Sequence, residues 1–275
     1  MRVLKQVFDF YINSSIHVAL AVVAMTWVTL IQFELPYNKV ILYFVFFATI
    51  SGYNFVKYFG VAKFHHRSLA NWLKAIQIFS FFAFIGMCFY VFKLHLNSLM
   101  CLLFLGIVTF LYAMPLLPMR YFRDSEMNLR QISGLKIYVI ALVWASVTVL
   151  LPLIEHKVSM TYEVVITTIQ RFVFVLVLML PFEIRDLKYD SLKLATIPQQ
   201  IGIKKTKIIG FLLLLVFVTL EFFMGGLKGN VMVSSIIISI MMLLFLWFSK
   251  ENQSKYYSAF WVETIPIFWV LLLLF

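Results

Sequence analysis

The sequence of 275 residues has few charged residues. Aspartate, glutamate, lysine and arginine make up 13% of it, about half of the roughly 25% that is typical of soluble domains. Hydrophobic residues make up 63%, which is more than one compact soluble core can bury. This balance excludes a soluble globular enzyme. It also excludes a disordered chain, which needs low hydrophobicity.

Cysteine is rare as well, with only Cys88 and Cys101. Each lies inside an apolar run, and neither has a partner at a metal-ligand spacing, so both are predicted to be packing residues. The sequence also lacks the ten-residue alternation of apolar and polar residues that marks outer-membrane β-barrels. A disulfide scaffold, a cysteine-ligated metal site and a membrane barrel are therefore not expected.

Long apolar runs are what the sequence does have. Runs of about twenty residues are typical of transmembrane helices, because only helices or closed barrels satisfy the backbone in lipid. We therefore expect an all-α, polytopic membrane protein with nine transmembrane helices in a single domain spanning residues 1–275. The stretch from Met1 to Ile12 is typical of a short amphipathic helix at the interface. The nine segments run roughly over 14–33, 38–56, 73–93, 97–115, 135–154, 161–182, 207–227, 230–249 and 257–275.

Basic residues outnumber acidic ones, with 23 lysines and arginines against 12 acids. If the N-terminus is cytoplasmic, eighteen basic residues fall in inside connections, four fall outside, and Arg171 lies within a span. This bias follows the positive-inside rule, so the charge predicts a cytoplasmic N-terminus and gives no reason to expect nucleic acid. We expect an integral, multi-pass protein of a bacterial inner (cytoplasmic) membrane, with membrane lipids around it.

Three acidic residues lie together after the sixth apolar segment: Glu183, Asp186 and Asp190. Their i, i+3, i+7 spacing places them within roughly 60° of one another on a helix. Carboxylates grouped in this way repel one another without a compensating cation, and Mg²⁺ accepts one or two carboxylates together with phosphate oxygens. The spacing thus predicts a site for Mg²⁺ and a diphosphate. The alternative is a solvated cluster paired with the interleaved basic residues.

The stretch from Glu183 to Asp190, followed by Thr196-Ile-Pro198 and Gly202, resembles the second aspartate-rich motif of the UbiA superfamily of intramembrane prenyltransferases. The resemblance implies nine helices, a cytoplasmic N-terminus, and Mg²⁺ ions that bind and ionise a polyprenyl diphosphate. The allylic cation then alkylates a lipophilic, usually aromatic, acceptor. It also implies that Asp186 and Asp190 are catalytic and that Glu183, Asp186 and Asp190 are metal ligands.

The first motif of that family, Asn-x-x-x-Asp-x-x-x-Asp, is only partly present. Asn54 is kept, while Tyr58 and Ala62 stand where the family has aspartates. Two interpretations follow. In the first, Lys57 replaces one metal ion and contacts the diphosphate directly as a point charge, while the second motif holds one Mg²⁺. In the second, the chain keeps the fold but does not ionise a prenyl diphosphate, and it binds an isoprenoid or lipid or acts on a different substrate.

Other residues complete the candidate site. Glu263 lies near the cytoplasmic start of the ninth apolar segment. It either faces the substrate chamber that the family resemblance implies or pairs with the interfacial Lys255. Lys136 flanks the fifth segment and is explained equally well by diphosphate binding or by topology. The candidate diphosphate contacts are Asn54, Lys57, Tyr58, Lys193 and Arg130.

Overall fold

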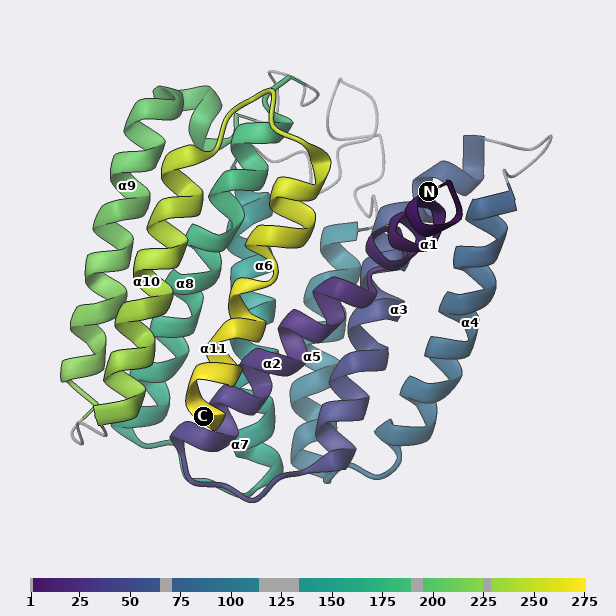
Figure 1. The fold of residues 1–275 in the computed structure, drawn as a ribbon. Helices are drawn as coiled ribbons and strands as arrows, with labels where there is room; N and C mark the ends of the chain where they lie inside the picture. The colour runs from purple at the N-terminus through teal and green to yellow at the C-terminus, as the bar shows by residue number, and fades with distance from the viewer. Residues whose placement is uncertain (1, 65–70, 114–133, 189–194, 225–228) are drawn as a thin grey trace, which may run out of the picture.

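The computed structural model describes residues 2–64, 71–113, 134–188, 195–224 and 229–275, and within these ranges the chain is helical with no strand (Figure 1). The predicted all-α class is therefore confirmed for the described residues. A helix lies at each of the nine apolar segments, although several are interrupted. The elements are α1 (Arg2–Asn13), α2 (Ile16–Gln32), α3 (Lys39–Phe64), α4 (Asn71–Val91), α5 (Leu96–Ala113), α6 (Leu135–Ala145), η2 (Ser146–Leu150), α7 (Leu151–Glu155), α8 (Tyr162–Asp186), α9 (Ile197–Phe222), α10 (Gly229–Phe248), η4 (Tyr257–Val262) and α11 (Ile265–Leu274).

Six helical stretches in the described part are long and apolar enough to cross a membrane, or seven if the bent α1–α2 pair is one span. The other two predicted spans fall short for different reasons. The apolar part of α5 is short, from Leu96 to Leu111, and α9 carries three lysines in its first half. The chain is thus a multi-pass membrane protein, while the count of nine spans and the side of the N-terminus stay predictions.

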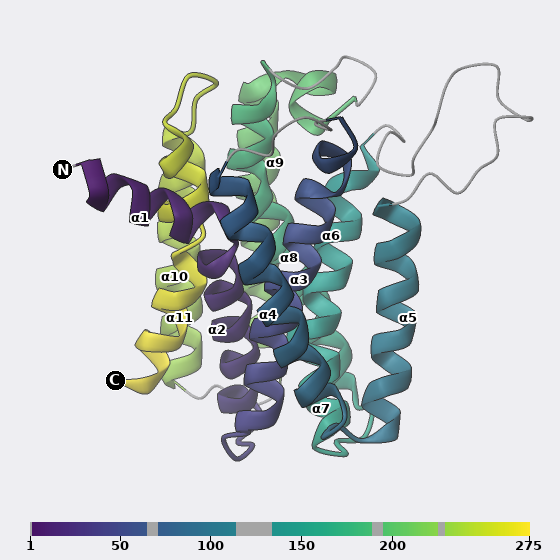
Figure 2. The same cartoon turned by 90° about the vertical axis from the view of Figure 1, so that its right-hand side faces the viewer.

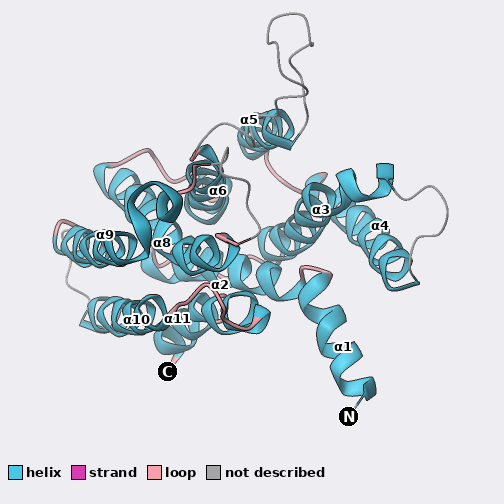
Figure 3. Ribbon diagram, turned by 90° about the horizontal axis from the view of Figure 1, so that it is seen from above, coloured by secondary structure: helices cyan, strands magenta, loops and turns pink. Residues whose placement is uncertain are grey.

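Helix α8 lies at the centre of the bundle. It packs on α6, α9 and α10, while α2 packs on α3 and α11. Phe174 of α8, Phe217 of α9 and Trp269 of α11 are fully buried, with ring centroids 5.1–5.7 Å apart. Viewed from above, α4 and α5 lie at the edge of the bundle (Figure 3). Their large apolar side chains are exposed on the outer surface, as expected of residues that face lipid.

The first two helices meet at a sharp break. Ser15 takes a left-handed conformation (φ 63°), and α1 bends 51° away from α2, so that α1 projects outward near one end of the bundle (Figures 2 and 3). Asn54 of α3 holds this break. Its side-chain amide donates to the Ser14 carbonyl at 3.0 Å, and its Oδ1 accepts from Ser15 Oγ at 2.8 Å. The predicted helix at the N-terminus is therefore present, and it ends where this polar contact begins.

Two π-helical segments interrupt the apolar helices. One, η2, separates α6 from α7, and the other, η4, precedes α11. Proline follows each of them, at Pro152 and Pro266. Such segments widen the local turn and are frequent at functional sites. Both border the cavity described next, through Val147 and Ala259.

Candidate functional site

A cavity of about 750 Å³ lies inside the bundle, between α2, α3, α5, α6, α8 and η4. We call it the chamber. Aliphatic and aromatic side chains dominate its interior, and the indole of Trp144 donates to the Tyr53 hydroxyl at 2.9 Å across it. The apolar lining includes Val18, Val22, Phe44, Ala48, Val56, Leu102, Val139, Ile140, Val143, Trp144, Val147, Met179 and Phe182.

Charged side chains line one end of the chamber, where α3 and α8 finish and α6 begins. Five of them are basic and two are acidic. The excess of positive charge favours an anion at this end, which we call the mouth. The seven residues are Lys57, Lys136, Arg185, Lys188, Lys255, Asp186 and Glu263.

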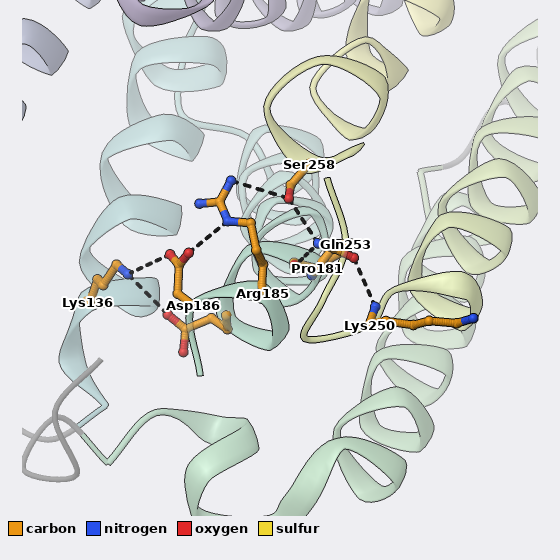
Figure 4. A network of polar contacts seen from close by, with 8 residues as sticks. Lys136, Pro181, Arg185, Asp186, Lys250, Gln253 and Ser258 are labelled. Atoms are coloured by element: carbon orange, nitrogen blue, oxygen red, sulfur yellow. Dashed lines mark hydrogen bonds and ion pairs between the residues drawn. The ribbon is translucent and has the colours of Figure 1, made fainter. Parts of the chain in front are cut away.

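The first two acids of the predicted motif lie at the end of α8 and are met by cations of the chain itself. Figure 4 labels Asp186 beside Lys136 and Arg185. Lys136 Nζ lies 3.7 Å from Glu183 Oε1 and 3.9 Å from Asp186 Oδ2. Arg185 Nε donates to Asp186 Oδ1 at 2.8 Å. Glu183 is buried and Asp186 lines the mouth. The compensating cations for these two acids therefore come from α8 itself, through Arg185, and from the distant helix α6, through Lys136.

Ser258 of η4 and Gln253 of the loop before it hold Arg185 in place. Arg185 Nη1 donates to Ser258 Oγ at 3.5 Å, and Gln253 Nε2 donates to the same oxygen at 3.0 Å. Gln253 also donates to the carbonyl of Pro181 at 2.8 Å (Figure 4). These contacts tie the last turn of α8 to the segment that leads into η4, so the mouth is built from elements distant in sequence.

The three described candidates from the first motif have different surroundings. Asn54 is buried and is not part of the chamber lining, because Ser14, Ser15 and Ser80 take its amide group. Tyr58 also lies outside the lining, and its hydroxyl donates to the Asn13 carbonyl at 2.8 Å. Only Lys57 borders the chamber, where its Nζ donates to the same carbonyl at 3.1 Å.

The remaining candidates lie outside the described residues: Asp190, Lys193 and Arg130. Within the described ranges, no group of three or more histidine, cysteine, aspartate or glutamate residues could hold a metal ion. Of the two described motif acids, Asp186 alone lines the chamber, and the ammonium of Lys136 already lies beside both. Because Asp190, the third predicted ligand, lies outside the described residues, the magnesium centre stays a prediction.

Some chamber residues were not selected from the sequence. Lys188 and Lys255 line the mouth. No feature of the sequence separates these two lysines from the other lysines expected at the membrane interface. Glu263 does face the chamber. The signal for Glu263 was its place at the start of the last apolar segment.

Lys255 also fastens α1 to the mouth. Its Nζ donates to Asp9 Oδ1 at 2.5 Å, and the Tyr256 hydroxyl donates to the same oxygen at 2.7 Å. The hydrogen bond from Lys255, reinforced by that from Tyr256, lowers the pKa of Asp9, and the bond to Asp9 raises the pKa of Lys255. We call this contact the α1 latch.

Arg171 does not line the chamber or its mouth. It is buried in the opposite half of α8, donates to the Met25 carbonyl at 2.7 Å, and stacks over Trp269 at 4.8 Å. This arrangement joins α8 to α2 and α11, which is a structural role.

No protein-family model, no curated protein and no solved structure matches this chain. The assignment of function therefore depends on the geometry of the chamber and on the resemblance of the motif.

Proposed function

We propose that this chain binds a polyprenyl diphosphate in the chamber and transfers the prenyl group to a lipophilic, aromatic acceptor, as a UbiA-type protein. The observation that carries the proposal is the polarity of the cavity, which is apolar within and basic at the mouth. We further propose nine membrane spans, with the N-terminus and the mouth on the cytoplasmic side of a bacterial inner membrane. The distribution of basic residues along the sequence supports that orientation.

Head-group charge is the main source of selectivity in this proposal. A prenyl chain that moves from the bilayer into the chamber exchanges one apolar environment for another, so the hydrophobic gain is small. The diphosphate, in contrast, exchanges water for charged donors. Lys57, Lys136 and Arg185 border the same end of the cavity, and hydrogen bonds between charged groups are roughly twice as strong as neutral ones.

The same cations support the chemical step. The bond between the allylic carbon and oxygen breaks, and its electron pair leaves with the diphosphate, whose developing charge the basic mouth stabilises. The acceptor carbon then bonds to the allylic cation and loses a proton. That proton ends on the released diphosphate, and Glu263 is the chamber-facing carboxylate that can relay it.

A second function is favoured by a specific observation. Glu183 and Asp186 are neutralised by Lys136 and Arg185, and the first motif lacks its aspartates. A protein with this arrangement can hold an isoprenoid or lipid anion without ionising it. Binding without transfer is therefore the alternative.

The test uses the purified chain in nanodiscs. Binding of farnesyl and geranylgeranyl diphosphate is measured, and release of diphosphate is followed with a panel of aromatic acceptors. Saturable binding with acceptor-dependent release supports the transferase, and binding without release for any acceptor supports the alternative. If neither diphosphate binds, the transferase is wrong, and the alternative then requires a ligand other than a prenyl diphosphate.

A further inference from the structure

We propose that Lys136 replaces the metal ion between the carboxylates of Glu183 and Asp186, so that the mouth binds a diphosphate head group without a divalent cation. This inference depends on the proposed function, because it concerns the ligand of the same site. It differs from the expectation drawn from the sequence, in which magnesium ions held by the acidic motif bind the diphosphate.

The position of the ammonium carries the inference. Lys136 Nζ lies between two carboxylates on one face of α8, at 3.7 Å and 3.9 Å from their oxygens. Glu183 is only 2% exposed, and a buried carboxylate needs a nearby positive charge. A divalent ion brought to the same place would be repelled by the ammonium. The lysine must therefore move away before a metal can bind there.

The location of Lys136 in its helix supports the same role. It is the second residue of α6, where the helix dipole disfavours a positive side chain. Gly134, in a left-handed conformation (φ 72°), is the N-cap of this helix, two residues before Lys136. The carboxylates of α8 are thus what stabilise a cation at this position.

The ammonium also keeps donors for a ligand. The distances to both carboxylates are those of an ion pair and exceed the usual hydrogen-bond range, so none of its three N–H groups is committed to a carboxylate by a short bond. The side chain is 23% exposed and lines the chamber. Its donors can therefore turn toward phosphate oxygens at the mouth while its charge still balances Glu183.

The experiment compares binding of geranylgeranyl diphosphate in nanodiscs with Mg²⁺ and with EDTA. The unmodified chain is expected to bind equally well in both, within about twofold. In EDTA, the Lys136→Gln variant is expected to bind geranylgeranyl diphosphate about tenfold more weakly. This corresponds to about 1.4 kcal/mol, as expected for the loss of one charged contact. Mg²⁺ should restore much of that loss, because the carboxylates can then accept the ion. Lys93→Gln, two residues after the end of α4 and outside the chamber lining, is the control and should leave both affinities unchanged.

A second measurement needs no prenyl ligand. Mn²⁺ alone, followed by its paramagnetic resonance signal, should bind to Lys136→Gln more tightly than to the unmodified chain. Equal binding of Mn²⁺ to the two proteins would overturn the inference, since the lysine would then not occupy the metal position.

The outcomes separate the inference from the proposed function. Binding of the diphosphate only when Mg²⁺ is present would overturn the inference and leave the proposed function intact. Absence of binding under both conditions would overturn the proposed function itself. If Lys136→Gln does not fold because Glu183 loses its counter-charge, the double variant Lys136→Gln, Glu183→Gln removes both charges. It should show the same tenfold loss in EDTA, and unchanged affinity there would also contradict the inference.

Discussion

Gly210 allows α9 to lie close against α8 and α10, and its replacement by alanine should crowd this contact. An added Cβ would overlap with Leu246 of α10 and would lie 2.9 Å from Leu180 Cδ1 of α8. Both leucines are fully buried, so they must repack against their neighbours, or α9 must shift, to accept the added Cβ. Leu180 directly precedes Pro181 and the turn that carries Glu183. Crowding here would therefore disturb the end of α8 that forms the mouth.

The magnitude follows from two opposing effects. Alanine is better than glycine in a helix by about 1 kcal/mol, whereas overpacking a filled core costs about 1–3 kcal/mol. Gly210→Ala should therefore range from neutral to about 2 kcal/mol less stable. Gly106→Ala is the matched control, because a Cβ there meets nothing within 4 Å, and it should gain up to about 1 kcal/mol.

The assay is unfolding of both variants in the same detergent or nanodisc, followed by helix circular dichroism. Comparison of the two variants removes most effects of the lipid environment. The Gly210 variant should unfold more easily than the Gly106 variant by about 1–3 kcal/mol. Equal stability, or a more stable Gly210 variant, would refute the close packing of α9 on its neighbours.

Three more predictions follow from single contacts. Glu155→Ala removes the buried acceptor for the hydroxyl and backbone N–H groups that begin α5, so unfolding should become easier by about 1–3 kcal/mol. Tyr53→Phe removes the acceptor of the Trp144 indole, and the fluorescence of that tryptophan should shift while the helix content stays constant. The α1 latch should be insensitive to pH from about 5 to 9. Because the pKa of Asp9 is lowered, its contribution to the stability of the latch is complete above the ordinary pKa of 3.8 and is lost as the pH falls further. Because the pKa of Lys255 is raised, its contribution to that stability is complete below the ordinary pKa of 10.5. Protease protection of α1 should follow this profile, and a decline between pH 5 and 9 would contradict it.

The helices could be located from the sequence because lipid imposes a simple rule on apolar runs. The predicted segment 73–93, for example, corresponds to α4 at Asn71–Val91, and 161–182 corresponds to α8 at Tyr162–Asp186. The breaks were not predictable in the same way. The η2 and η4 segments change only the hydrogen-bond register, which leaves the apolar pattern unaltered.

The candidate site was harder to predict, because it depends on contacts between distant helices. The ion pair between Lys136 and Glu183 joins residues on α6 and α8, and nothing in the local sequence distinguishes that lysine from one that only sets topology. Asn54 shows the opposite case. Its place in the motif predicted a diphosphate contact, while its amide holds the break between α1 and α2. Where a helix is interrupted inside the protein, backbone groups lose their helical hydrogen bonds and need another partner. The sequence does not show that α1 and α2 are interrupted at Ser14 and Ser15.

The most direct test of the central claim is photolabelling with a prenyl diphosphate that carries a photoreactive group at the end of its chain. The account predicts labelling of chamber side chains such as Val143, Val147 and Met179. Unlabelled geranylgeranyl diphosphate should compete, and the corresponding alcohol, which lacks the charged head group, should not. Labelling confined to the lipid-facing side chains of α4 and α5, or equal competition by the alcohol, would contradict the assignment of the chamber as a prenyl diphosphate site.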